Sequence, residues 1–409
     1  MRCRHCNNEL QFEFIDLINS PASNSFLTKE QLNEPELFFP LKIYVCDKCF
    51  LVQVDEYKKS TDIFNHEYVY FSSYSTSWLA HCKKYADKMC ERFSLNQNSL
   101  VMEIASNDGY MLQYFHEKGI PTLGIEPTKN TAEVAISKGI NTIVDFFSTK
   151  FASESLNNKG IAPDLIAAKN VLAHVPDIND FVKGLKIALG KQGVITIEFP
   201  HLLKLVQECQ FDTIYHEHFS YLSFYTVNKI FESYGLTMFD VEELPTHGGS
   251  LRIYAQHKDT GINTISDNVA KLLQKEKDAG LLDIQSYSDF KNRADIIRSH
   301  FNIFISEQNL KGKKVVAYGA AAKGNTFLNY CGTKTGQINY CIDASPHKQN
   351  KYMPGSHIPV VSEDILKQDK PDYIIILPWN LRTEITEQLS YVREWGAKFV
   401  IAIPELTII

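Results

Sequence analysis

Residues 100–109 read Leu-Val-Met-Glu-Ile-Ala-Ser-Asn-Asp-Gly, which has the pattern of a buried strand that ends in a turn of small residues. An amphipathic segment follows over residues 110–118 and is typical of a helix. Open α/β sheets bind ligands at the carboxyl ends of their strands, beside turns of this kind. We therefore expect a strand of such a sheet here, with a ligand close to the turn.

The next predicted strand, residues 122–127, reads Thr-Leu-Gly-Ile-Glu-Pro and ends in an acidic residue about 20 positions after the turn. A carboxylate in this place commonly accepts hydrogen bonds from ribose hydroxyls. The turn lacks the G-x-G-x-x-G pattern of a dinucleotide site, and Glu103 and Asp108 place negative charge beside it. This suits a cofactor with a cationic sulfonium and an amine rather than phosphates. The alternative is an ordinary strand, turn and helix with incidental carboxylates.

Strand-like and helix-like segments alternate along the rest of the chain. Residues 164–168 and 193–200 continue the first sheet, whereas residues 313–325 read as a strand and a small-residue loop that opens a helix. Residues 372–377 supply another buried strand. Such alternation predicts mostly parallel, doubly wound sheets. The loop after residue 318 and the helix that it opens favour phosphate binding, so we expect a second unit of nucleotide-binding type.

Two short cysteine pairs mark the N-terminal part of the chain. Cys3-Arg4-His5-Cys6 and Cys46-Asp47-Lys48-Cys49 each place two thiolates close enough to share one tetrahedral cation. Four sulfur ligands fill the coordination shell of Zn²⁺ and leave no open position for water, so we predict a structural zinc site. Chance spacing or a redox pair is the alternative. The long gap between the pairs indicates an excursion of the chain between two knuckles.

The composition limits the classes of function. The 409 residues are 44% hydrophobic and 22% charged, with a net charge of −6 and a pI near 6.1, which argues against a nucleic-acid surface. No apolar run approaches the roughly 20 residues that span a bilayer, and no secretory signal is recognisable. We expect a cytoplasmic protein without a membrane partner, either a monomer or a weak homo-oligomer.

A run of polar and aromatic side chains follows the strand at residues 193–200. Residues 210–221, the His-rich segment, read Gln-Phe-Asp-Thr-Ile-Tyr-His-Glu-His-Phe-Ser-Tyr. A catalytic zinc helix would carry H-E-x-x-H, and that spacing is absent. The segment therefore favours acid–base chemistry over metal catalysis. A structural polar patch remains the other interpretation.

Four stretches of this sequence, residues 101–109, 124–128, 170–177 and the His-rich segment, resemble the sugar C-methyltransferases. The resemblance covers nearly the whole chain. It implies a zinc-binding module over residues 1–66, a Rossmann-like methyltransferase domain that uses S-adenosylmethionine over residues 67–260, and a second Rossmann-like α/β domain over residues 261–409.

The resemblance also implies a reaction in deoxysugar biosynthesis. The expected substrate is a nucleotide sugar, a 4-keto-6-deoxyhexose linked to thymidine diphosphate (dTDP), with the methyl group added at C3 through an enolate. Methylation at C5, and O- or N-methylation of another small metabolite, are the alternatives among enzymes. A zinc-bearing scaffold whose methyltransferase fold serves only binding is a further one.

Carried over to this sequence, the resemblance assigns three groups of residues. Those expected around S-adenosylmethionine are Glu103, Ala105, Asn107, Gly109, Glu126, Pro127, Phe146, Phe147, Asn170 and Val171. Those expected at the nucleotide sugar are His247, Gly248, Arg252, Lys323, Asn325, His347 and Lys348. Those expected to act in the reaction are His218, Tyr215, Glu217, His174 and Tyr70.

Among the last group, His218 is the expected base, because an imidazole is well matched to proton transfer near neutral pH. Tyr215 is either the alternative base or the group that holds the C4 oxygen. Glu217 would orient an imidazole or a sugar hydroxyl, and His174 would donate to the enolate. Tyr70 belongs to a tyrosine-rich stretch that is expected to reach over the active site.

Overall fold

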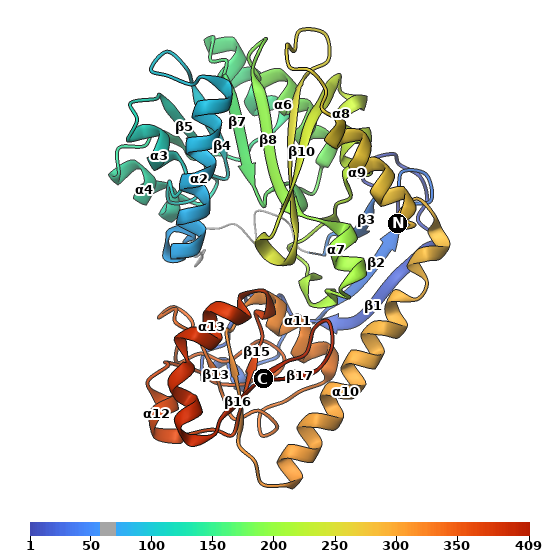
Figure 1. Cartoon of the computed structure of the whole chain (residues 1–409), viewed down its shortest axis with the longest axis vertical. Helices are drawn as coiled ribbons and strands as arrows, with labels where there is room; N and C mark the ends of the chain where they lie inside the picture. The colour runs from blue at the N-terminus through green and yellow to red at the C-terminus, as the bar shows by residue number, and fades with distance from the viewer. Residues whose placement is uncertain (58–70) are drawn as a thin grey trace.

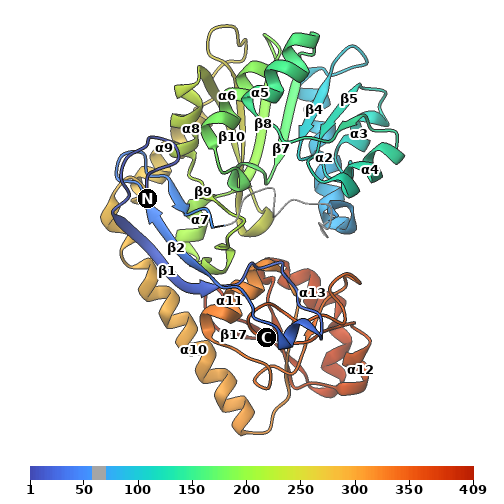
Figure 2. The same ribbon diagram turned by 180° about the vertical axis from the view of Figure 1, so that it is seen from behind.

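Three β-sheets organise the protein, which a computed structural model describes over residues 1–57 and 71–409. A seven-stranded sheet lies in the upper body of Figure 1 and a six-stranded sheet in the lower body. A four-stranded sheet begins beside the upper body and extends toward the lower one (Figures 1 and 2). No helix of the described residues has the length and apolar character needed to cross a membrane.

The seven-stranded sheet is the doubly wound sheet that the sequence predicts. Its strands, in spatial order, are β10 (Leu236–Leu244), β11 (Ser250–His257), β8 (Val194–Pro200), β7 (Leu165–Lys169), β4 (Val101–Ile104), β5 (Thr122–Ile125) and β6 (Thr142–Ile143). The five strands from β8 to β6 are parallel, and β11 and β10 add an antiparallel edge. Every residue of β4 and β7 is buried because helices cover both faces.

The helices divide between the two faces of this sheet. On one face lie α2 (Thr76–Phe93), α3 (Leu112–His116) and α4 (Lys129–Ser137). On the other lie α5 (Thr149–Phe151), α6 (Ile178–Ala188), α8 (Phe224–Ser233) and α9 (Asp267–Asp278). The helix expected over residues 110–118 is α3, which is shorter than expected because turns occupy the first two and the last two of these positions.

The six-stranded sheet confirms the second α/β unit. Its order is β14 (Val360–Val361), β13 (Cys341–Ile342), β12 (Val315–Tyr318), β15 (Tyr373–Ile376), β16 (Lys398–Ile401) and β17 (Thr407–Ile408), all parallel except β17. Its helices are α10 (Phe290–Leu310), α11 (Ala322–Cys331), α12 (Ile365–Asp369) and α13 (Arg382–Gln388). The long helix α10 runs along the side of the molecule from the upper body to the lower one (Figure 1).

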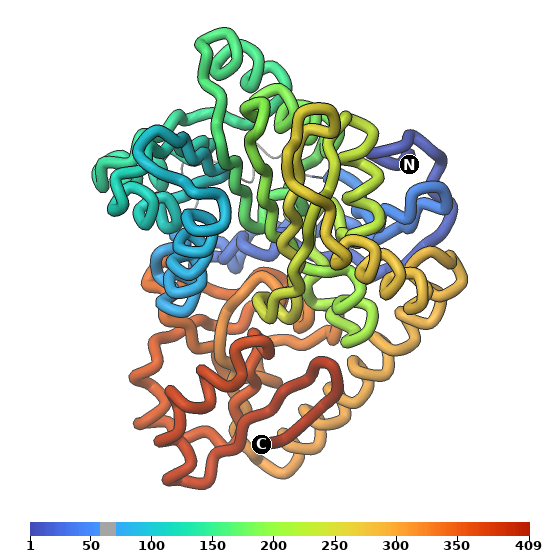
Figure 3. Tube along the Cα trace, turned by 45° about the horizontal axis from the view of Figure 1, so that its top comes forward, coloured from blue at the N-terminus to red at the C-terminus, as the bar shows by residue number. Residues whose placement is uncertain are grey.

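The four-stranded sheet contains β1 (Phe12–Ser20), β2 (Phe39–Val45), β3 (Val52–Val54) and β9 (Ser220–Tyr221). Residues 7–45, between the cysteine pairs, form what we call the arm: β1 leads outward, β2 returns, and residues 21–38 form the tip. The arm runs toward the six-stranded sheet (Figures 2 and 3), where Leu27 forms a β-bridge with Tyr352. The sequence predicts an excursion here but not its docking on the C-terminal unit.

Candidate active site

The four predicted metal ligands converge at the base of the arm. The sulfur of Cys3 lies 3.5 Å from that of Cys49, the sulfur of Cys6 lies 3.5 Å from that of Cys46, and all four sulfurs lie within 4.8 Å of one another. A tetrahedral zinc ion with Zn–S bonds of about 2.3 Å separates its sulfurs by about 3.8 Å. The four side chains therefore fit Zn²⁺. The imidazole of His5 instead bonds to Asn179 at 2.9 Å.

The turn after β4 has an unusual backbone. Ala105, Asn107 and Gly109 all adopt left-handed conformations, with φ of 54°, 46° and 76°. A Cβ atom on Gly109 would come within 2.4 Å of Ile140 Cδ1, so this position requires glycine. A Cβ atom on Gly124 would come within 2.5 Å of Ser106 Oγ. The turn thus curls tightly at the carboxyl edge of the sheet, where ligands of such sheets bind.

Two buried carboxylates flank this turn. Burial raises the pKa of Glu103 well above its usual range, and the neighbouring phenol of Tyr110 opposes that shift. Within the described residues, neither oxygen of Glu103 has a hydrogen-bond partner of standard geometry. A buried carboxylate without such a partner is costly for the protein alone. It fits a cationic ligand group such as the amine of S-adenosylmethionine.

Glu126, at the end of β5, joins the turn to its neighbouring strand. Its Oε2 accepts a hydrogen bond from the backbone N–H of Asn107, and its Oε1 accepts one from that of Thr128, both at 2.8 Å. Burial raises the pKa of this carboxyl group as well. The hydroxyl of Thr128 also donates to Oε1. Because a carboxylate offers about four acceptor positions, the remaining capacity of Glu126 for a ribose hydroxyl lies on Oε2.

The segment before α2 closes over the same turn. The backbone N–H of Ser72 donates to Asn107 Oδ1 at 2.9 Å, and the hydroxyl of Ser73 donates to the Asp108 carboxylate. Ser72 and Ser73 belong to the tyrosine-rich stretch that is expected to reach over the site. Tyr70 itself lies outside the described residues, so its expected place is untested.

The two phenylalanines expected around S-adenosylmethionine lie in different surroundings. Phe146 is 37% exposed, whereas Phe147 packs edge-on against Phe181, with ring centroids 5.4 Å apart. Pro127 and Val171 are half-buried at the ends of β5 and β7. Each of them thus lies at the carboxyl edge of the sheet, while the ring of Phe147 is committed to the core.

Tyr215 and His218, from the His-rich segment, form a hydrogen-bonded pair. The Nδ1 of His218 lies 2.9 Å from the carbonyl oxygen of Thr213, so Nδ1 carries the hydrogen and donates it. Nε2 then presents its lone pair, and the hydroxyl of Tyr215 donates to it at 2.8 Å. Burial lowers the pKa of His218 well below its usual range, and the neighbouring His174 lowers it further. The geometry yields a neutral imidazole with a basic nitrogen aimed at a phenol.

Two further imidazoles lie beside this pair. The ring of His174 lies 4.6 Å from that of His218, and burial lowers its pKa to about 4. His247, with a left-handed φ of 56°, accepts a hydrogen bond on Nε2 from the amide of Asn170 at 3.0 Å. His247 itself is exposed. The imidazoles of His174 and His218 are therefore neutral near pH 7.

The C-terminal unit reaches this cluster through Lys323, the second residue of α11. Its amino group donates to Asn380 Oδ1 at 2.7 Å and lies 4.5 Å from the ring centroid of Trp379. The indole of Trp379 donates to Asp212 Oδ2 at 2.7 Å, and burial raises the pKa of Asp212 to about 6. No local sequence pattern marks Trp379, Asn380 or Asp212 as site residues, because only the folded chain brings these residues together.

The remaining residues expected at the substrate have partners of their own. A Cβ atom on Gly248 would come within 2.4 Å of Trp379, so it is the indole that approaches this glycine closely. Asn325 is fully buried and donates to the carbonyl oxygen of Ser23 at 2.5 Å. Lys348 donates to the carbonyl oxygen of Ala320 at 2.9 Å, in the loop after β12, and His347 is exposed beside it.

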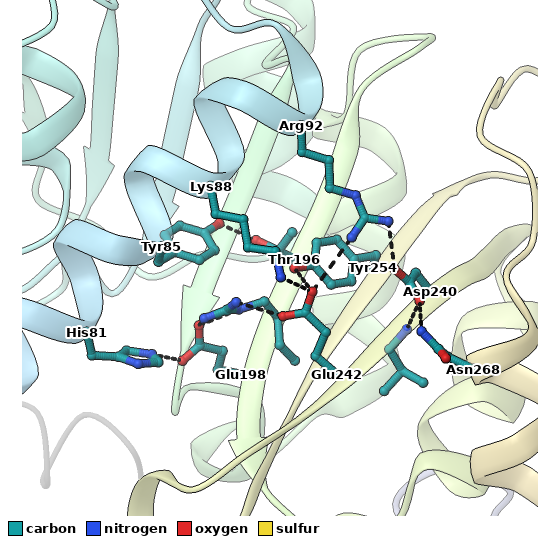
Figure 4. Close-up of polar contacts among 12 residues, drawn as sticks. His81, Tyr85, Lys88, Arg92, Thr196, Glu198, Asp240, Glu242, Tyr254 and Asn268 are labelled. Carbon is teal, nitrogen blue, oxygen red and sulfur yellow. Dashed lines mark hydrogen bonds and ion pairs between the residues drawn. The ribbon is translucent and has the colours of Figure 1, made fainter.

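Arg252 belongs to a network of buried charges that includes residues of α2. It bonds to Glu198 at 2.7 Å and to Glu242 at 3.0 Å. Glu198 also bonds to the buried amino group of Lys169 and to His81. Figure 4 shows His81 and Glu198 joined at one end of this network. Arg252 therefore uses its guanidinium to tie β11 to β8 and β10.

Protein families match three consecutive parts of the chain. Residues 3–64 match a zinc-binding domain, residues 78–241 match the family described as "Methyltransferase domain", and residues 245–404 match the family described as "C-methyltransferase C-terminal domain". These three regions correspond to the cysteine pairs with the arm, most of the seven-stranded sheet, and the six-stranded sheet with its helices.

Individual proteins give a consistent comparison. The chain is 32% identical to the C-methyltransferase NovU of Streptomyces niveus over 407 residues, which cover 100% of this chain and 96% of the relative. Among solved structures, it is similar to S-adenosylmethionine-dependent methyltransferases of Clostridium acetobutylicum and Archaeoglobus fulgidus. The Clostridium structure is 11% identical to this chain and covers 44% of it and 92% of its own chain. The Archaeoglobus structure is 14% identical and covers 42% of this chain and 93% of its own chain. Each has a TM-score of 0.35.

Proposed function

The chain belongs to the S-adenosylmethionine-dependent C-methyltransferases, the family of NovU, and we propose that it methylates C3 of a 4-keto-6-deoxyhexose linked to thymidine diphosphate. The observation that carries the proposal is the Tyr215–His218 pair, a neutral imidazole and a phenol in hydrogen-bond contact. O-methylation of an alcohol or N-methylation of an amine would not require the deprotonation of a carbon acid. A neutral imidazole with a lone pair on Nε2 can act as the base in that step.

The ketone at C4 of such a sugar acidifies the hydrogen on C3. We assign Nε2 of His218 as the base that takes this proton, because Thr213 holds the hydrogen of the ring on Nδ1. The hydroxyl of Tyr215 then leaves Nε2 and donates to the C4 oxygen, where it stabilises the negative charge of the enolate. S-adenosylmethionine, when bound, supplies the electrophilic methyl group. The electron pair from the broken C3–H bond forms the new bond from C3 to this methyl carbon. The bond from the methyl carbon to sulfur breaks, its electron pair stays on the sulfur, and S-adenosylhomocysteine is the leaving group.

We further propose that the dTDP group lies against the C-terminal unit. Lys323 and His247 are the residues best placed to receive it, since the charge of Lys323 already acts on His247. The loop after β12 opens α11, and the backbone N–H groups of Gly319, Ala320 and Ala321 in this loop already donate within the protein. A phosphate would therefore meet the N–H groups of the first turn of α11. His347 and Lys348 lie beside this loop and remain candidates for the nucleotide end.

The test combines S-adenosylmethionine labelled in its methyl group with a panel of nucleotide-linked ketosugars, and mass spectrometry of the products. We expect label on a dTDP-4-keto-6-deoxyhexose, with the new carbon bond at C3 by NMR. We also expect the C3 hydrogen to exchange in heavy water. A product labelled at oxygen or nitrogen, or at C5, would refute the proposed reaction.

The His218→Ala variant tests the assignment of the base. We expect it to lose about a hundredfold or more in kcat, since general-base catalysis contributes about 10²–10⁴-fold. Its affinity for S-adenosylhomocysteine, measured by calorimetry, should change by less than about threefold. Comparable losses in both quantities would make His218 a structural residue.

A further inference from the structure

The zinc-binding module and the C-terminal unit both hold the His-rich segment. Its end, β9, pairs with β3 of the four-stranded sheet, with Ser220 opposite Gln53. The Nε2 of His216 donates to the carbonyl oxygen of Pro40, in β2, at 3.1 Å. From the other side, the hydroxyl of Thr326 in α11 donates to the carbonyl oxygen of Ile214 at 2.8 Å. The residues assigned to proton transfer thus lie on a segment fixed by two other parts of the molecule.

One side chain of the arm reaches Glu217 in this segment. The amide nitrogen of Asn24, at the tip of the arm, lies 2.8 Å from Oε1 and 3.0 Å from Oε2 of Glu217. Glu217 is only 7% exposed, so its carboxylate depends on protein donors for stabilisation. Asn24 lies 193 positions earlier in the chain, and only the fold of the arm brings the two side chains together.

The tip is itself fixed to the C-terminal unit next to Asn24. The carbonyl oxygen of Ser23 accepts the hydrogen bond from the buried Asn325 of α11. Further along the tip, Glu36 accepts a hydrogen bond from the backbone N–H of Gly355 at 2.8 Å and pairs with His357. Asn24 is therefore held from the side of α11, while its amide restrains Glu217.

We propose that Asn24 is a positioning residue for methyl transfer, through which the zinc-binding module fixes the Glu217 carboxylate beside the proton-transfer residues. The inference rests on the proposed function of the His-rich segment. The backbone of Glu217 hydrogen-bonds the imidazole of His174, and His218 follows Glu217 directly in the chain. A shift of the backbone at Glu217, once its side chain is no longer held by Asn24, would therefore move both imidazoles.

Asn24→Ala is the first variant, and Ser25→Ala is its matched control, because Ser25 is the exposed neighbour on the same tip. Without the amide, Glu217 loses a charge-assisted hydrogen bond, and we expect kcat to fall about ten- to a hundredfold. The KM for the methyl donor and the affinity for S-adenosylhomocysteine should stay within about twofold. The control should match the wild type. An Asn24→Ala variant with wild-type kcat would overturn the inference.

Asn24→Asp separates positioning from a merely structural contact. It places a second carboxylate against that of Glu217, and the pair should hold one shared proton up to a pH above the usual carboxyl range. We expect kcat at pH 8 to be lower than in Asn24→Ala and to recover as the pH falls toward 6, since the introduced carboxyl group, once protonated, can donate to Glu217. Parallel pH profiles of the wild type and this variant would contradict the inference.

A thermodynamic cycle of Asn24→Ala, Glu217→Gln and the double variant, read by thermal unfolding, tests the contact without any sugar substrate. Destabilisation by the two changes should be less than additive. Additive effects would show that the two side chains are not coupled and would overturn the inference whatever the substrate is. If the wild type is inactive with every ketosugar, only the proposed function is refuted. The cycle then decides whether Asn24 and Glu217 are coupled.

Discussion

The side chain of His218 sets an expectation for the pH dependence of the reaction. Burial lowers the pKa of His218 well below its usual range, and it lowers that of His174 to about 4. A free histidine has a pKa of about 6.5. These imidazoles should therefore remain neutral to lower pH than ordinary ones. We expect kcat/KM to hold as the pH falls from 8 to 6 and to decline only below that.

The control is the melting temperature over the same pH range. In the unfolded chain these imidazoles regain an ordinary pKa and bind protons first, so the stability that depends on them is present at neutral pH and is lost as the pH falls. The decline of kcat/KM should be measured where the protein is still folded. An acid limb centred at or above pH 6.5 in folded protein would contradict the assignment of His218.

The sequence predicts contacts between side chains that lie close together in the chain, and it misses contacts that form only when the chain folds. Tyr215 and His218 are three positions apart, and their chemistry is readable from the run itself. Trp379 and Asp212 are 167 positions apart, and no local pattern indicates their contact. The family resemblance assigned Arg252 to the nucleotide sugar, and it gave no indication of the ion pairs that Arg252 forms with Glu198 and Glu242.

At the scale of elements, the turn after β4 is the tightest part of the cofactor region, and Gly109 tests it. Alanine would suffer both a positive φ of 76° and the clash with Ile140. We expect Gly109→Ala to cost about 2–4 kcal/mol in the free energy of unfolding and to weaken the binding of S-adenosylhomocysteine at least tenfold. Chemical denaturation and calorimetry provide the two measurements.

Gly119→Ala is the matched control for that variant. Gly119 has nearly the same φ, 72°, but an added Cβ atom would meet nothing within 4 Å. This change should cost only the backbone strain, about 1–2 kcal/mol, and leave ligand binding intact. Equal effects of the two variants on binding would mean that the packing of the turn does not shape the cofactor region.

Element identity was largely predictable because hydrophobic periodicity reports burial. β4, β5, β7, β8, β12 and β15 all occur where apolar runs predict them. The arm was less predictable, since the alternation in β1 and β2 shows that one face is buried but not what covers it. Leu27 and Glu36 of its tip contact the C-terminal unit, and Asn325 of that unit contacts the tip. These contacts join segments that lie far apart in the sequence.

At the scale of the whole molecule, the zinc site lies at the base of the arm, and the arm runs from there to the C-terminal unit (Figure 2). A filled shell of four sulfurs excludes the ion from the reaction. Its effect should pass instead through the four-stranded sheet, because β9 of the His-rich segment is the last strand of that sheet. We therefore expect metal binding to affect the geometry of the residues proposed for proton transfer.

Loss of the metal should therefore reduce turnover without abolishing cofactor binding. Cys6→Ser removes one ligand, and Cys90→Ser, in α2 and outside the cysteine cluster, is the matched control. We expect Cys6→Ser to lose zinc, to melt at a lower temperature and to lose at least tenfold in kcat, because an unanchored arm no longer restrains Glu217. Its affinity for S-adenosylhomocysteine should change less than about threefold, since Ser72 and Glu126 hold the turn after β4. A zinc-free variant that keeps its full kcat would show that the four-stranded sheet holds the His-rich segment without the ion.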